Sequence, residues 1–176
     1  MMTSMSLIET LRQRRSIRQF KDQPIPAETL GILKEALLRS PSSRAIRPWF
    51  FALVEDKDQL LKLSQAKPHG ADFLKGAALG IVVCGDSSRS DVWIEDCSIA
   101  AVIAHLTAVS LGLGSCWIQI RERHYDDTTS AEQYVQRQLS LPEHMKVLAI
   151  IAVGYGAEDK AGVPFEDLPV DRFSAL

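Results

Sequence analysis

Apolar residues recur along the chain with two periods, which together predict an alternation of helices and strands. Residues 5–14 carry Leu7, Ile8 and Leu11 at the spacing of one helix face. Other stretches, such as WFFALV and MKVLAIIAV, are continuously apolar over the length of a strand. Helices are therefore predicted at 5–14, from near Pro26 to before Pro41, and near 57–66, 91–111 and 129–139. Strands are predicted at 49–54, 77–84, 115–120 and 145–153.

The stretch 91–111 is the longest predicted element, and its apolar residues occur on nearly every side of a helical wheel. A helix of this kind is either buried or spans a membrane. Asp91, Glu95, Asp96 and His105 interrupt the apolar run too often for a membrane span. We therefore expect this stretch to form the central helix of a packed core.

The order of the predicted elements indicates the fold class. Strands alternate with helices, and no two strands are joined by a tight hairpin turn. Residues 145–153 lack polar alternation, as expected of a central strand that is covered on both faces. This pattern is typical of an α+β or α/β sandwich with helices on both sides of a mixed sheet. The tail, residues 154–176, is rich in turn residues and is expected to be a loop.

Composition limits the classes of protein to consider. The 176 residues are 46% hydrophobic and 24% charged, as in a soluble globular protein, and we expect one domain over residues 1–176. The first fifteen residues lack the apolar segment of a secretory signal, which favours a cytoplasmic protein. Cys84, Cys97 and Cys116 lie far apart in apolar runs and are expected to be buried thiols. The four histidines show no ligand spacing, so no metal site is predicted.

A cluster of arginines is the main chemical signal in the sequence. Arg12, Arg14, Arg15 and Arg18 lie within seven positions of a chain whose formal net charge is −2. Nucleic-acid-binding domains usually carry a basic stripe over a whole face, so a local cluster favours a small phosphorylated ligand. In an extended segment Arg14, Ser16 and Arg18 project to one side, where two guanidinium groups and a hydroxyl suit a phosphate monoester. A solvated basic patch at a helix C-terminus remains the alternative.

Four segments, in order, resemble the nitroreductase family of FMN-dependent oxidoreductases. RRSIRQF resembles the family's RRSxRxF, and PSSRAIRPWFFALV resembles PSxxNxQPWxFxVV. EDCSIAAVIAHLTAVSLGLGSCWIQ is similar to QDxxIAAxNLxLAAxxLGLGSCWIG, and AIIAVGYGAEDK resembles the closing strand and its GYPxE turn. The resemblance covers nearly the whole chain. It implies a nitroreductase-like α+β fold, a three-layer sandwich of a mixed sheet flanked by helices, assembled as an intertwined homodimer with FMN at the subunit interface.

The resemblance also implies which residues contact FMN. The first group would hold the phosphate and the ribityl end, the second would reach the flavin of the other subunit, and the third would lie along the flavin ring. The implied residues are Arg14, Arg15, Ser16, Arg18 and Lys160, then Pro41, Ser42, Ser43 and Arg47, then Trp117, Ile118 and Gln119. Some positions depart from the family's pattern and leave the strength of FMN binding open: Ala45, Arg47, Ile103, Gln119 and Gly162.

The activity implied by the resemblance is that of an FMN-dependent NAD(P)H oxidoreductase. NADH or NADPH would deliver hydride to flavin N5, and a nitroaromatic, a quinone or a related electrophile would then collect the electrons. No catalytic side chain is expected, because the cofactor carries the chemistry. Two alternatives stay open: a non-catalytic flavin-binding or storage protein, and a flavoenzyme specialised for one metabolite. In the second case, residues 64–76 would select the substrate. Neither nucleic acid nor membrane is expected as a partner.

Overall fold

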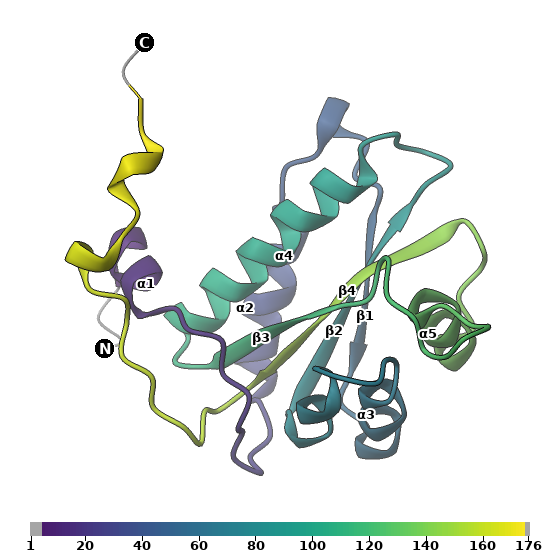
Figure 1. Ribbon diagram of the computed structural model, residues 1–176, viewed down its shortest axis with the longest axis horizontal. Coiled ribbons are helices and arrows are strands. Elements are labelled where there is room, and N and C mark those ends of the chain that lie inside the picture. The colour runs from purple at the N-terminus through teal and green to yellow at the C-terminus, as the bar shows by residue number, and fades with distance from the viewer. Residues whose placement is uncertain (1–4, 175–176) are drawn as a thin grey trace.

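This structure, a computed structural model, describes residues 5–174 (Figure 1). Within them the helices and strands follow the predicted order, each within a few residues of its expected bounds. The α-helices are α1 (Leu7–Gln13), α2 (Ala27–Leu38), α3 (Lys57–Ser64), α4 (Trp93–Ser110) and α5 (Ala131–Leu139). The strands are β1 (Trp49–Val54), β2 (Leu79–Asp86), β3 (Gly114–Gln119) and β4 (Met145–Gly154). Short 3-10 helices lie in the connections: η1 (Ser43–Ala45), η2 (Asp72–Gly76), η3 (Phe165–Asp167) and η4 (Val170–Arg172).

The four strands form one sheet in the order β1-β2-β4-β3, and every neighbouring pair is antiparallel. The α+β class is confirmed, but the expected mixed sheet is limited to one isolated parallel bridge, between Ser16 and Ser115 beside β3. The connections explain the antiparallel order. Val54, at the end of β1, pairs with Gly80 near the start of β2, so the α3 connection returns the chain to the sheet end from which it left.

The sheet separates two apolar layers, because successive side chains of a strand face opposite sides. In β2, Ile81 and Val83 face α2 and α4, whereas Val82 and Cys84 face α3 and α5. Figure 1 shows these helix pairs on the two sides of the sheet. The central strand β4 is buried from Val147 onward, as its unbroken apolar run predicted. The molecule is therefore a three-layer sandwich with helices on both faces.

Helix α4 is the core helix that the sequence predicted. It is long and apolar enough to span a membrane by composition, but its buried residues include Ala100, Ala101 and Ala104, which pack in the core. It ends where Gly112 adopts a left-handed φ of 73° and Leu113 N–H donates to the Ala108 carbonyl, a glycine-terminated helix cap. Its opposite face leaves Ile99 and Val102 exposed, and nothing in the described chain covers them.

The N-terminal helix and the tail lie side by side, apart from the sheet (Figure 1). Helix α1 begins at a capping box in which the Ser6 and Glu9 side chains each bond the other's backbone N–H. Over residues 155–174 the tail is a loop that contains the bridge residue Gly156, opposite Phe20, and the short helices η3 and η4. Both segments expose large apolar side chains, which are Leu7, Ile8, Leu11, Val163, Phe165, Leu168, Val170 and Phe173. Large apolar side chains that are exposed on adjacent segments are typical of an interaction surface.

The three cysteines are buried thiols, as predicted. Burial raises the pKa of Cys84, Cys97 and Cys116 above the usual thiol range. Because the thiolate is the reactive form, these residues serve packing rather than nucleophilic chemistry.

Candidate functional site

The arginine-rich segment is extended and lies along the outer edge of β3. Ile17 N–H donates to the Ser115 carbonyl at 3.0 Å, and Ala157 N–H donates to the Gln19 carbonyl at 2.8 Å. Gly114 allows this close approach, because a Cβ at that position would lie 2.9 Å from the Cβ of Ile17. The backbone on either side of Ile17 is therefore fixed against the sheet.

The segment forms one wall of a cavity of about 1110 Å³, whose other walls are α1 and residues 160–168 of the tail. Arg14, Ser16 and Arg18 line it together, as their alternation predicted. Regular alternation along an extended segment would turn Arg15 to the opposite side, but it lines the same cavity, because its guanidinium turns to donate to the Ala161 carbonyl at 2.7 Å. The remaining lining residues are Ile8, Leu11, Arg12, Lys160, Gly162, Val163, Pro164, Phe165 and Leu168.

Glu158 organises the polar end of this cavity, and the sequence analysis missed it. Its Oε1 accepts from Arg18 N–H at 2.5 Å, from Gln19 N–H at 3.3 Å and from Lys160 Nζ at 2.9 Å. Lys160 Nζ also donates to the Ser16 carbonyl at 3.0 Å. The bond from Arg18 N–H and that from Lys160 lower the pKa of Glu158, which keeps the carboxylate ionised. The acidic position of the GYGAEDK motif was the available signal.

Most cations of the cavity are not neutralised within the described chain. Among residues 5–174, Lys160 pairs with Glu158, whereas Arg14 and Arg18 form no ion pair. The Arg18 guanidinium lies 5.8 Å from the centre of the Phe73 ring, a cation–π contact that leaves its charge available. The cavity therefore presents excess positive charge to an anion.

A buried histidine lies behind the arginine segment. His105 Nδ1 and Ser115 Oγ are 2.7 Å apart, and the imidazole stacks on the Trp117 ring with 6.4 Å between centres. Burial and the nearby charge of Arg14 lower the pKa of His105 to about 4. The imidazole is therefore neutral at physiological pH, and it adds no charge to the cavity.

The β3 residues that the resemblance singled out differ in accessibility. Trp117 Nε1 donates to Gln119 Oε1 at 2.9 Å, and Gln119 Nε2 donates to the Arg121 carbonyl at 2.8 Å, so the two side chains hold each other. Ile118 is fully buried in the α3 and α5 layer. With 0% of the residue exposed, neither its side chain nor its backbone is accessible to a ligand in the described chain.

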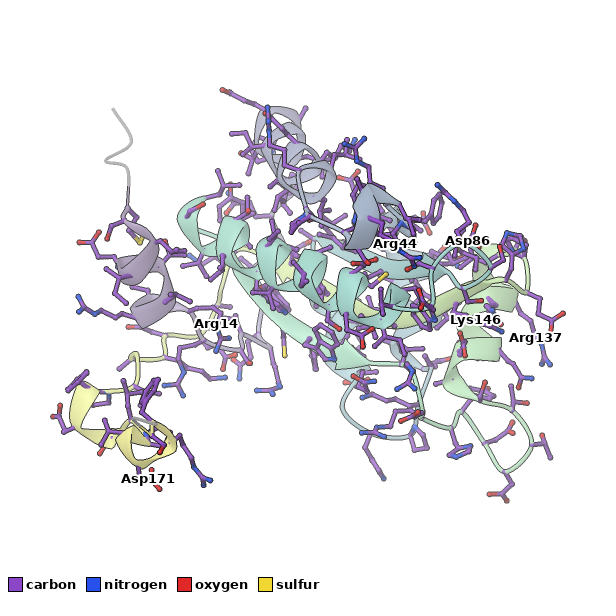
Figure 2. The ribbon with its side chains drawn as sticks, turned by 90° about the horizontal axis from the view of Figure 1, so that it is seen from above. Arg14, Arg44, Asp86, Arg137, Lys146 and Asp171 are labelled. Atoms are coloured by element: carbon purple, nitrogen blue, oxygen red, sulfur yellow. The ribbon has the colours of Figure 1, made fainter. Side chains whose placement is uncertain are left out.

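The second group of candidate residues lies elsewhere in the chain. Pro41, Ser42 and Arg47 line a separate cavity of about 510 Å³, together with Leu38, Arg39, Ser40 and Ala45. Figure 2 shows Arg14 near α1 and one end of α4, and Arg44 near the other end of that helix. One chain therefore brings Arg14, Arg15, Ser16, Arg18 and Lys160 together, but not with the segment 41–47.

The loop from Pro41 to Pro48 is strained. Arg44, Ala45 and Arg47 adopt left-handed φ values of 52°, 54° and 53°. Each non-glycine residue in this region costs about 1 to 2 kcal/mol. Such strain persists only where surrounding contacts enforce it, and it clusters at binding and active sites.

The departure at Gly162 has a steric explanation. A Cβ at this position would collide with the carbonyl oxygen of Arg12. Glycine therefore lets the tail pass directly against the end of α1, and Gly162 itself forms part of the cavity wall.

Fold and cavity together define a class of protein: an α+β sandwich with a cationic cleft, suited to a phosphorylated ligand, at the edge of its sheet. The model of the nitroreductase family matches residues 11–67 and 63–155. The chain belongs to the nitroreductase family.

Relatives and solved structures agree with this assignment. An FMN-dependent nitroreductase from Clostridium difficile R20291 is 44% identical, with a TM-score of 0.94 over 96% of this chain and 98% of that one. A protein of Methanothermobacter thermautotrophicus, provisionally named NADH dehydrogenase/NAD(P)H nitroreductase, is 35% identical over 89% of this chain and 81% of its own length. FMN reductase [NAD(P)H] of Bacillus subtilis is 26% identical over 90% and 69%, respectively.

Proposed function

We propose that this protein is an FMN-dependent NAD(P)H oxidoreductase that reduces nitroaromatics, quinones or related electrophiles. Family membership and the names of the relatives, an FMN-dependent nitroreductase and an FMN reductase, support the cofactor and the class of reaction. The single observation that carries the assignment to this chain is the cationic cavity lined by Arg14, Ser16, Arg18 and Lys160.

The residues of this cavity fit the phosphate of FMN. Arg14 and Arg15 offer planar paired donors with permanent charge, and Ser16 adds a hydroxyl between them and Arg18. Lys160 stands at the same end, held by Glu158 and the Ser16 carbonyl. The Glu158 carboxylate accepts hydrogen bonds from the backbone N–H groups of Arg18 and Gln19, so its negative charge is partly compensated and repels the phosphate less.

The complete site would need a second copy of the chain. The segment 41–47 and the arginine cavity lie at opposite ends of α4, whose 18 residues span about 27 Å. The exposed apolar residues of α1, α4 and the tail could be buried in an interface with this second copy. We infer a homodimer in which Pro41, Ser42, Ser43 and Arg47 of one subunit complete the FMN site of the other.

When bound, FMN would accept hydride from NADH or NADPH and pass the electrons to the acceptor through its N5 position. The chain would supply position and charge. Arg18, exposed and cationic, would stabilise negative charge at the pyrimidine edge of the reduced flavin. The indole of Trp117, fixed by Gln119 and His105, would form a rigid wall beside the ring, and the fully buried Ile118 would support β3 from inside the core.

An absorption spectrum taken without oxygen tests this function. The purified protein, loaded with FMN, should show the flavin band, and NADH or NADPH should bleach it; adding a nitroaromatic or a quinone should restore the colour. A yellow protein that no reduced nicotinamide bleaches would instead be a flavin-binding or storage protein. Bleaching without reoxidation by any of these acceptors would favour a flavoenzyme specialised for one metabolite.

A further inference from the structure

The strained loop 41–47 is tied to the segment that leads into α4. Ser43 N–H donates to Asp96 Oδ1 at 2.8 Å, and Arg44 Nη2 lies 2.6 Å from Asp91 Oδ1. Arg89 Nη2 donates to the Ile46 carbonyl at 3.0 Å. These contacts come from residues 89–96, so a single neighbouring segment sets the conformation of the loop.

The bond to Asp96 differs from the others in burial. Asp96 is 3% exposed, whereas the side chains of Arg44 and Asp91 are 65% and 79% exposed. A charge-assisted hydrogen bond that is shielded from water is much stronger than an exposed ion pair, which water and salt screen. Asp96 is therefore the dominant anchor of the loop.

The place of Asp96 is itself fixed by close packing. It lies in the first turn of α4, where a carboxylate is favoured by the helix dipole. The same turn packs directly on β2, because a Cβ at Gly85 would lie 2.6 Å from the Trp93 ring and 3.0 Å from Cys97 Sγ. Asp96 thus joins the exposed loop to a helix turn that is tightly packed against the core.

The ligand contacts of the loop 41–47 depend on its backbone conformation. Ala45 carries no polar side chain, and Arg47 N–H is already bonded to Ser42 Oγ at 2.8 Å. Apart from the Arg47 guanidinium, its polar contacts with a ligand would therefore come from backbone groups and the serine hydroxyls. The positions of those groups follow directly from the backbone conformation that the Ser43–Asp96 bond enforces.

We propose that Asp96 is the positioning residue of the 41–47 half of the FMN site: by holding the Ser43 amide, it preorganises this loop for the flavin of the partner subunit. This inference rests on the proposed function. Preorganisation raises affinity because the loop does not have to be ordered when the ligand binds.

The test is FMN affinity, measured by quenching of flavin fluorescence on titration with apoprotein. Asp96→Ala should weaken FMN binding by about tenfold or more, because it removes a shielded hydrogen bond to a charged group. Asp96→Asn keeps an oxygen that accepts from Ser43 N–H and should restore most of the affinity. Asp91→Ala, the matched control, removes only the exposed ion pair of the same loop and should change affinity by less than about threefold.

A second measurement separates positioning from general stability and needs no variant. Hydrogen exchange of the wild-type apoprotein should show the Ser43 amide protected before FMN is added. Exchange of that amide at the rate of an unfolded chain, or wild-type FMN affinity in Asp96→Ala, would overturn the role of Asp96. Failure of the wild-type protein to bind FMN would instead overturn the proposed function.

Discussion

Gly114→Ala is the sharpest single test of how the sheet shapes the phosphate cavity. The added methyl would lie 2.9 Å from both Cβ and Cγ2 of Ile17 and 3.0 Å from Cγ1. Because Cβ is fixed to the backbone, a rotamer change cannot relieve this contact, and the segment that carries Arg14, Ser16 and Arg18 must move outward. Overpacking of this kind costs about 1 to 3 kcal/mol.

Two measurements report the effect of this substitution. Urea denaturation of the apoprotein should give a free energy of unfolding lower by about that amount. If the substitution costs about 3 kcal/mol and half of that cost opposes FMN binding, FMN should bind roughly tenfold more weakly. Gly31→Ala is the matched control: nothing lies within 4 Å of its Cβ in α2, so the same change should stabilise the helix by about 0.5 to 1 kcal/mol.

Removing the opposing side chain completes the experiment. Ile17→Ala in the Gly114→Ala background removes the clashing Cγ atoms, so the two substitutions should be less harmful together than the sum of their separate effects. Strict additivity, or a Gly114→Ala variant with wild-type stability and FMN affinity, would refute the view that close packing on β3 fixes the cavity.

Other parts of the structure give four further predictions. Ala45→Asn should raise the free energy of unfolding by about 0.5 to 1 kcal/mol in thermal or urea denaturation, because asparagine tolerates the left-handed region better than alanine. The pKa of His105 is lowered from 6.5 to about 4 in the folded protein, so the unfolded chain takes up this proton at a higher pH. The free energy of unfolding should therefore be highest above pH 6.5 and should decline by about 3 kcal/mol toward pH 4. His105→Gln should remove this part of the pH dependence. Arg18→Ala should weaken FMN retention and lower the flavin potential in a redox titration, and unchanged values would count against its role. Phe165→Ser with Phe173→Ser should shift the sedimentation of the protein toward the monomer, because both side chains are exposed in one chain, at 75% and 89%.

Local apolar periodicity was enough to locate the helices and strands, because burial on one or both faces requires apolar residues at regular positions in the sequence. Strand direction leaves no such mark. The prediction of a mixed sheet was wrong because the apolar pattern of β2 is the same whether β1 runs parallel or antiparallel to it. The α3 connection, which brings the chain back to Gly80 opposite Val54, decides the direction.

Part of the candidate site was predictable because it is local. Arg14, Ser16 and Arg18 alternate along one extended segment, and an alternation of this kind is visible in the sequence. Arg15 faces the same cavity because of one contact with Ala161, 146 residues away, and Glu158 contacts Arg18 across 140 residues. Contacts over such separations depend on the tertiary fold and have no periodic signal.

The strain in the loop 41–47 was also hidden. Left-handed positions are usually signalled by glycine, asparagine or aspartate, but Arg44, Ala45 and Arg47 are none of these. Their conformation is enforced from outside the loop, by residues 89–96. The pairing of Trp117 with Gln119 was not predicted either, because Gln119 stands where the family pattern usually has glycine or glutamate.

A crystal structure of the protein grown with FMN tests whether two subunits share the cofactor site. We expect a dimer with the phosphate of FMN bound by Arg14, Ser16 and Lys160 of one subunit, and the flavin in contact with Ser42 and Ser43 of the other. Phosphate density in another part of the molecule, or a flavin site completed within a single chain, would contradict it.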